Sequence, residues 1–189
     1  MALSCFGGLK MNLLQSTALA LVVLAPFGAA SAAAPYAKLS YGETTNIEAA
    51  GFSLNDGDAY GVALGSSFGP VRAEAGVSHL EGSFAGGILA ADAIDYHATA
   101  YLDFPISERA GVFAGAGGDY VQAEANTPGP SLEGSGTGYH WALGGAYRLN
   151  DNIILEAQFR QVSASVDLDF IGDTDVDASE VTVGLRFRL

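Results

Sequence analysis

The stretch Val181-Thr-Val-Gly-Leu-Arg-Phe-Arg-Leu189 ends the chain and decides its fold. Its even positions are small, polar or charged, and its apolar residues stand at the odd positions, Val181, Val183, Leu185, Phe187 and Leu189. Alternation with a period of two is typical of a β-strand with one apolar and one polar face. A strand of about 9–11 residues with this pattern is long enough to cross an outer membrane when it is tilted in a barrel.

Earlier segments of the chain alternate in the same way. In residues 94–104, for example, Tyr96 and Leu102 oppose Asp95 and Asp103. Residues 111–120 are rich in glycine, and there we place Val112, Ala114 and Ala116 outward and Phe113, Gly115, Gly117 and Asp119 inward. With the last stretch, the pattern predicts eight strands, at residues 36–41, 59–66, 71–78, 94–104, 111–120, 139–149, 153–161 and 181–189.

The connections between these strands alternate between long and short. The long ones are polar, acidic or rich in Gly and Pro, and span 42–58, 79–93, 121–138 and 162–178; the short ones span 67–70, 105–109 and 150–152. Transmembrane barrels have short periplasmic turns and long extracellular loops. The sequence therefore predicts an all-β, eight-stranded antiparallel up-and-down barrel with both termini in the periplasm.

The N-terminal segment has the features of a secretory signal peptide. Lys10 precedes a nearly apolar run over residues 13–27, and small residues follow it. This order is typical of a cleaved signal, and the run is short for a transmembrane helix, although a retained anchor is the alternative. Ala30-Ser31-Ala32 is the preferred cleavage motif and Ser31-Ala32-Ala33 the next. We expect a signal peptide at 1–32, with Met11 as a possible true start, and the barrel domain at 33–189.

The composition limits the chemistry of the exported chain. Cys5, the one cysteine, lies in the predicted signal, so the barrel has no disulfide or cysteine metal site. Without Lys10, seven basic residues stand against 21 acidic ones, a net charge of −14. Nucleic-acid binding needs clustered Lys and Arg, so we exclude nucleic acid as a partner. We also expect no cofactor.

The distribution of large side chains indicates the medium around the barrel. One face of the strands carries large apolar residues, whereas the other combines glycines with charges, which suits the narrow interior of an eight-stranded barrel. A lipocalin-type ligand carrier is the soluble alternative, but it needs an apolar lumen. Aromatic residues near the strand ends predict interfacial girdles: Tyr36, Tyr41, Tyr60, Phe104, Tyr120, Tyr139, Trp141, Tyr147 and Phe187.

Five segments carry a family resemblance over most of the predicted barrel. They are Val71-Arg-Ala-Glu-Ala-Gly-Val77, Tyr101-Leu-Asp-Phe-Pro105, Gly111-Val-Phe-Ala-Gly-Ala-Gly117, Ala142-Leu-Gly-Gly-Ala-Tyr-Arg-Leu149 and Val183-Gly-Leu-Arg-Phe-Arg-Leu189. In this order they resemble small outer-membrane β-barrels of the OmpA-like and opacity-protein type. The resemblance implies that the last strand carries the signal read by the barrel-assembly machinery, here Val183, Leu185, Phe187 and Leu189. The family commonly ends on an aromatic residue, so Leu189 is atypical.

Two groups of polar residues are expected inside the lumen. Asp95, His97, Asp119 and His140 would meet near its outer end, whereas His79 faces out by parity. Such a His–Asp group can bind a metal or act as a general base, but a hydrogen-bonded structural network is the favoured interpretation. Near the periplasmic end, Arg72 can face Asp103 and Glu156 can face Arg186. We expect the whole lower set to plug the lumen: Arg72, Glu74, Asp103, Glu156, Arg186 and Arg188.

The predicted loops indicate a contact surface. Residues 173–177, Asp-Thr-Asp-Val-Asp, open like a calcium loop but lack its later glycine and glutamate, so a solvated acidic loop is favoured. We therefore predict a non-enzymatic barrel with a role in envelope structure or adhesion. Its expected partners are outer-membrane lipid, lipopolysaccharide and an extracellular ligand of the acidic loops. A narrow porin-like channel and a lipid-A-modifying enzyme are the alternatives.

Overall fold

The computed structural model of the chain describes residues 33–49, 52–54, 57–84, 89–126, 132–168 and 172–189. Its strands are β1 (Ala34–Ala49), β2 (Phe52–Leu54), β3 (Gly57–Phe68), β4 (Val71–Phe84), β5 (Leu89–Pro105), β6 (Ala110–Asn126), β7 (Leu132–Arg148), β8 (Ile153–Leu168) and β9 (Gly172–Arg188). The predicted signal peptide, 1–32, lies outside the described residues. Within the described part of the chain, no helix is long and apolar enough to span a membrane.

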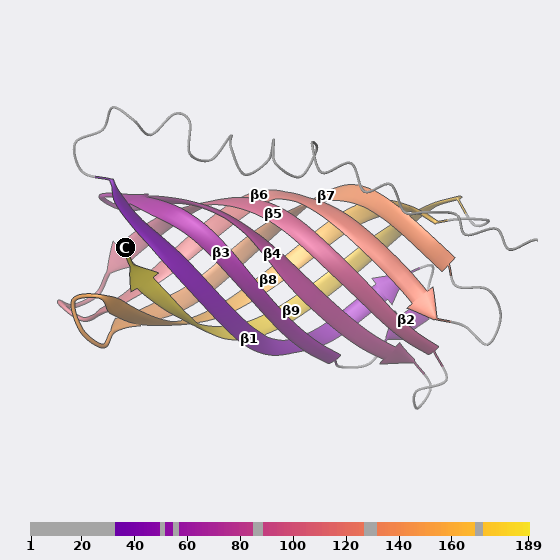
Figure 1. Cartoon of the computed structure of the whole chain (residues 1–189), viewed down its shortest axis with the longest axis horizontal. Helices are drawn as coiled ribbons and strands as arrows, with labels where there is room; N and C mark the ends of the chain where they lie inside the picture. Colours follow the sequence, from indigo (N-terminus) through magenta and orange to yellow (C-terminus); the bar gives the residue numbers. More distant parts are fainter. Residues whose placement is uncertain (1–32, 50–51, 55–56, 85–88, 127–131, 169–171) are drawn as a thin grey trace, which may run out of the picture.

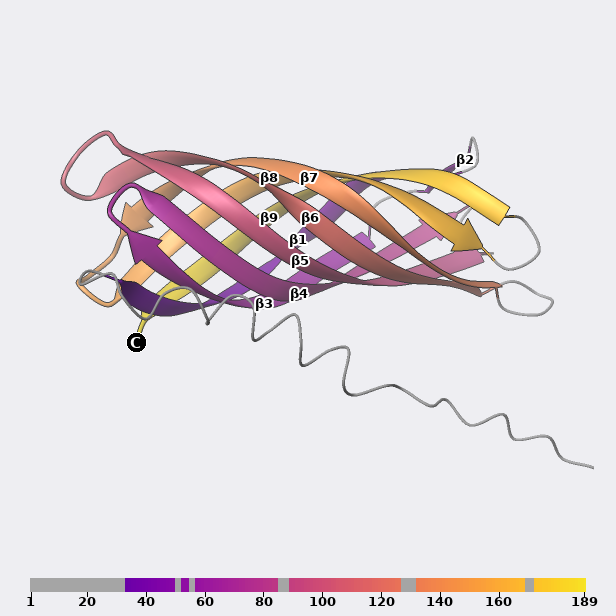
Figure 2. The same cartoon turned by 90° about the horizontal axis from the view of Figure 1, so that it is seen from above.

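Eight of the strands form a closed antiparallel barrel. Each long strand pairs with the next one along the chain, and β9 returns to pair with β1, while the three-residue β2 adds to one end of β1. Figure 1 shows the strands inclined to the long axis of the barrel, and Figure 2 shows the same arrangement from above. The predicted eight-stranded up-and-down barrel is confirmed.

Both ends of the barrel domain lie at one end of the barrel, at the left of Figure 1. Tyr36 pairs with Arg188, and the backbone N–H of Leu189 donates to the carbonyl of Pro35 at 3.0 Å. We call this the lower end and the opposite one the upper end. Gly69 has φ 63° in the tight turn between β3 and β4 at the lower end, a conformation that favours glycine.

Most residues of the four predicted long loops form strands instead, so this part of the prediction is wrong. At the upper end β1 runs to Ala49, β4 to Phe84, β6 to Asn126 and β8 to Leu168. Residues 173–177 lie within β9, so they form no calcium-type loop, and Asp173, Asp175 and Asp177 point outward. The strands continue because the alternation with a period of two continues. In the upper segments, however, the apolar residues lie on the inward face and the polar residues on the outward face.

This exchange of faces divides the barrel into two halves. In the lower half the outward side chains are apolar, such as Leu143 and Val183, which are 52% and 53% exposed. In the upper half Val162, Ala164 and Val166 point inward and are buried, whereas Ser165 between them is exposed. Val121, Ala164 and Val166 pack together inside, with Ala93 and Val176 against them. The outer surface of the lower half is therefore suited to contact with lipid, and the outer surface of the upper half is suited to contact with water.

The outer surface of the upper half is acidic. No Lys or Arg occurs in 42–58, 79–93, 121–138 or 162–178. The described carboxylates that face outward there form what we call the acidic collar: Glu43, Glu48, Asp58, Glu81, Asp92, Glu124, Glu133, Asp167, Asp173, Asp175 and Asp177. The segments in which we expected a contact surface on loops are thus largely strands.

The aromatic residues expected at the interfaces face outward with one exception. Tyr41, Tyr60, Tyr120, Tyr139, Trp141, Phe104 and Tyr147 are all exposed on the outer face, and Phe187 is partly exposed there. Tyr36 is the exception, because its side chain points into the lumen and is 1% exposed. A glycine, Gly65, stands beside the Tyr36 ring on β3 and leaves room for it.

Candidate functional site: two ion networks in the lumen

The lower half of the lumen contains a network of ion pairs centred on Arg72 of β4. Its Nε lies 2.9 Å from Asp103 Oδ2 on β5, and its Nη1 lies 3.4 Å from Glu156 Oε1 on β8. The Arg72 side chain is fully buried. Arg72 and Asp103 are therefore brought together as the alternation indicated, and Glu156 is added from the other side of the barrel.

Two further cations complete this lower network. Arg186 Nη2 lies 3.1 Å from Glu156 Oε1, the second pairing anticipated from parity. Lys38 Nζ lies 2.8 Å from Glu74 Oε1, a pair that the sequence analysis missed. Arg188 does not join the network: it is exposed at the lower opening, and we find no ion pair between it and another described residue.

Aromatic rings support the lower network. Tyr101 and Phe113 pack edge to face at 5.6 Å, and the Arg72 guanidinium lies 4.4 Å from the first ring centre and 4.9 Å from the second. Cation–π contacts of this length stabilise a desolvated guanidinium. Gly115 and Gly144 lie beside these rings, where a Cβ atom would collide with them. The inward glycines of the sequence thus make space for two inward aromatic residues.

The upper network is centred on Arg160 of β8. Its Nη2 lies 2.5 Å from Asp95 Oδ2, its Nε 2.8 Å from Glu180 Oε1, and its Nη1 3.6 Å from Asp119 Oδ1. All four side chains are buried. One guanidinium thus faces three carboxylates, and it occupies the position that a metal ion would take among them.

Two histidines border the upper network. His140 Nδ1 lies 2.8 Å from Asp119, and its Nε2 lies 2.9 Å from the Thr99 hydroxyl. His97 Nδ1 lies 3.4 Å from Asp95 Oδ2, and the two imidazole rings meet edge to face at 6.1 Å. The predicted set of Asp95, His97, Asp119 and His140 is therefore brought together in the structure.

The charges of the two networks balance differently. In the lower network Lys38, Arg72 and Arg186 offset Glu74, Asp103 and Glu156. In the upper network one arginine meets three carboxylates, so its single positive charge does not offset all of their negative charge. The hydrogen bond between His140 Nδ1 and Asp119 is a second means of stabilising one of these carboxylates.

Thr99, His140 and Asp119 are linked in the same order as the hydroxyl nucleophile, the general base and the base-orienting carboxylate of a catalytic triad. All three residues are buried, at 4%, 1% and 6% exposure. Between the two networks, among the described residues, a cavity of about 10 Å³ borders His97 and Arg160. This space is at the lower limit for a single water molecule, and Thr99, His140 and Asp119 are not among the residues that line it.

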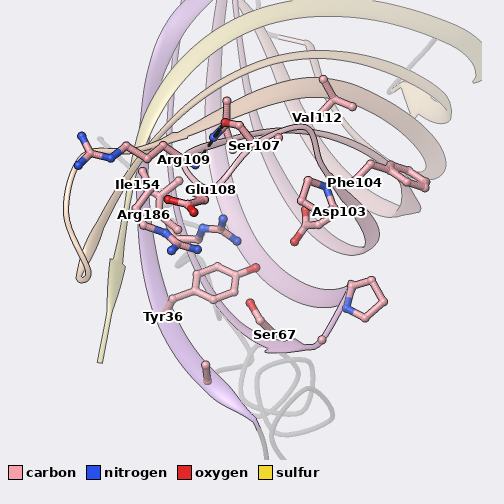
Figure 3. A pocket seen from close by; sticks show the side chains of 18 of the residues that line it. Tyr36, Ser67, Asp103, Phe104, Ser107, Glu108, Arg109, Val112, Ile154 and Arg186 are labelled. Carbon is pink, nitrogen blue, oxygen red and sulfur yellow. Dashed lines mark hydrogen bonds between the residues drawn. The ribbon is translucent and has the colours of Figure 1, made fainter.

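A larger cavity opens at the lower end of the lumen. Its volume is about 470 Å³, and Figure 3 shows Tyr36, Asp103, Glu108 and Arg186 around it. Arg109, Arg148 and Arg188 also line it. The exposed basic side chains therefore gather at the lower opening, opposite the acidic collar.

Arg160 is the functional residue of the lumen that sequence reasoning missed. The alternation of residues 153–161 puts Arg160 on the same face as Glu156, but it does not indicate that Arg160 would meet β5, β6 and β9 together. Glu180 was missed because it precedes the predicted last strand, whereas β9 begins at Gly172.

Comparisons with known proteins agree with this architecture. The chain matches the structure of Neisserial surface protein A with a TM-score of 0.70 and 16% identity, over 82% of this chain and 97% of that one. It matches Ail, the attachment invasion locus protein of Yersinia pestis, with a TM-score of 0.55 and 17% identity, over 82% and 99%. The N-terminal β-barrel domain of Pseudomonas aeruginosa OprF gives 0.53 and 14%, over 81% and 97%.

At these identities the likeness shows the fold alone. A search of curated proteins found no match. The family model described as "Outer membrane protein beta-barrel domain" matches residues 16–188, which is most of the chain. The chain therefore belongs to the outer membrane protein beta-barrel domain family.

Proposed function

We propose that this protein is a non-enzymatic outer-membrane barrel whose lumen is plugged and whose acidic collar is its contact surface outside the cell. The observation that carries the proposal is the pair of buried ion networks, which occupy the lumen one above the other. A role in envelope structure or adhesion follows, because a closed lumen leaves the outer surface as the place where partners bind.

The plug is tested against the channel alternative by conductance in planar lipid bilayers. We expect the wild-type protein to give no stable conductance steps. The double variant Arg72→Ala with Glu156→Ala is expected to introduce steps, because it removes two buried, ion-paired side chains that fill the lower lumen beside Tyr101. Regular steps from the wild-type protein would overturn the plug and favour a narrow channel.

The absence of enzymatic activity is tested on lipopolysaccharide. Thr99, His140 and Asp119 resemble a catalytic arrangement, but their burial supports a structural role. We expect lipid A incubated with the folded protein to keep its mass. A mass change that is lost in His140→Ala would instead assign the protein to the lipid-modifying enzymes.

The orientation is tested with single cysteines, since Cys5 lies in the predicted signal and the remaining chain has no thiol. Ser165→Cys places a thiol on the upper half, and Asp151→Cys places one in the lower turn between β7 and β8. A membrane-impermeant maleimide is expected to label the first variant on intact cells. The second should react only after the outer membrane is permeabilised, and the reverse result would contradict the proposed orientation.

A further inference from the structure

Three metal-binding side chains meet on the outer face of the barrel, away from both lumen networks. His79 and Glu81 are two residues apart on β4, so they share a face, and Glu81 lies directly opposite Asp92 on β5. One ligand atom from each of the three lies within 4.8 Å of the other two. The atoms that bind a tetrahedral Zn²⁺ lie roughly 3.3 Å apart, given metal–ligand distances of about 2.0–2.2 Å. Small side-chain rotations would therefore bring these three into range.

The negative charges around this group favour the binding of a cation. Glu81, Asp92, Glu124 and Glu133 are direct cross-strand partners, one on each of the strands β4 to β7. Like charges directly opposite each other destabilise a sheet. No Lys or Arg occurs in the upper segments 42–58, 79–93, 121–138 and 162–178. A bound divalent cation would remove the repulsion between Glu81 and Asp92.

The imidazole of His79 is held in place toward this group. Its ring stacks on Tyr60 of β3, with ring centres 4.9 Å apart and planes 25° apart. Its Nδ1 lies 3.6 Å from Glu81 Oε1, is buried, and has no hydrogen-bond partner among the described residues. This nitrogen could bind a metal ion without breaking a hydrogen bond to another described residue.

We propose that His79, Glu81 and Asp92 form a surface site for a divalent transition-metal ion of the Zn²⁺ type. One imidazole nitrogen and two carboxylate oxygens are ligands that suit Zn²⁺, whereas Ca²⁺ and Mg²⁺ prefer oxygen ligands alone. The three residues are partly exposed, so at least one coordination position opens outward. The site lies on the acidic collar, beside Tyr60, which is the direct cross-strand partner of His79.

Binding is measured by isothermal titration calorimetry of the folded barrel, prepared without a polyhistidine tag, with Zn²⁺ as the titrant. We expect one ion per chain. His79→Ala, Glu81→Gln and Asp92→Asn should each weaken binding by about tenfold or more. Asp175→Asn is the matched control, because it removes a collar carboxylate on β9 without touching the site. Heat-modifiable mobility on gels shows whether each variant is folded.

Co²⁺ gives a second readout that does not depend on affinity alone. A four-coordinate site is expected to produce an intense visible d–d absorption band on Co²⁺ binding, and loss of the imidazole ligand in His79→Ala should weaken and shift this band. Loss of affinity in Asp175→Asn equal to that in Asp92→Asn, or equal affinity for Ca²⁺ and Zn²⁺, would overturn the proposal in favour of diffuse attraction to the collar. Absence of Zn²⁺ binding by the folded wild-type protein would also overturn it.

Discussion

Arg160 on β8 reaches across the lumen to Asp95 on β5, with Nη2 lying 2.5 Å from Oδ2, although the two residues are 65 positions apart in the sequence. The contact joins strands that are not neighbours in the sheet. It therefore fixes the cross-section of the barrel as well as filling it. The same guanidinium also faces Asp119 and Glu180, so the upper network depends on one cation.

Replacing this cation is expected to be strongly destabilising. Arg160→Met would leave three buried carboxylates without their partner, and breaking a buried ion pair from one side costs on the order of 3–5 kcal/mol. The measurement is the free energy of unfolding in urea, followed by the fluorescence of Trp141. Adding Asp95→Asn to Arg160→Met should recover part of the loss. Additive effects of the two substitutions would contradict the coupling.

Arg186 and Arg188 of β9 provide a test position and a control position for the lower network. Arg186 is buried, pairs with Glu156 at 3.1 Å and lies 5.1 Å from the centre of the Tyr36 ring, whereas Arg188 is exposed. We expect Arg186→Ala to lower the free energy of unfolding by about 1–3 kcal/mol, and Arg188→Ala to change it by less than about 0.5 kcal/mol. Equal unfolding midpoints for wild type and Arg186→Ala would count against a structural role for the pair.

Adjacent glycines of β7 test the packing of the lumen. A Cβ atom at Gly144 would collide with the Phe113 ring, whereas the nearest atom to a Cβ at Gly145 is 3.9 Å away. Gly144→Ala is therefore expected to cost about 1–3 kcal/mol through overpacking. Gly145→Ala should be neutral or slightly stabilising, since it removes backbone freedom from the unfolded chain. Similar losses in both variants would indicate a backbone effect rather than contact with the ring.

A pair of outward arginines tests where the membrane ends on the barrel. Leu143 lies on the apolar lower half and Ser165 on the polar upper half. Leu143→Arg is expected to cost about 2–4 kcal/mol in a lipid bilayer, as a charge does near the midplane. Ser165→Arg should be near neutral, because water already surrounds that position. The comparison is made by urea unfolding in vesicles, and an equal cost at both positions would place the upper half in lipid as well.

The barrel and the direction of most side chains followed from the sequence. Alternation with a period of two assigns each side chain to a face, and large apolar residues on one face with glycines and charges on the other identify lipid outside and a filled lumen inside. The pairs Arg72–Asp103 and Glu156–Arg186 could be named because each joins neighbouring strands. The alternation within each strand was enough to name these two pairs, because strands that are adjacent in the sequence pair with each other in an up-and-down barrel.

The upper half of the barrel and the centre of its lumen were decided by the tertiary structure. Residues 162–167 keep the strand period, but Val162, Ala164 and Val166 point inward, and the Ser and Asp residues beside them made the segment resemble a loop. Arg160 meets Asp95 only because closure of the sheet brings β5 and β8 face to face. The distance across the lumen between Arg160 and Asp95 cannot be read from their spacing in the sequence. Closure of the barrel, and not the strand pattern, determines which inward side chains can reach one another.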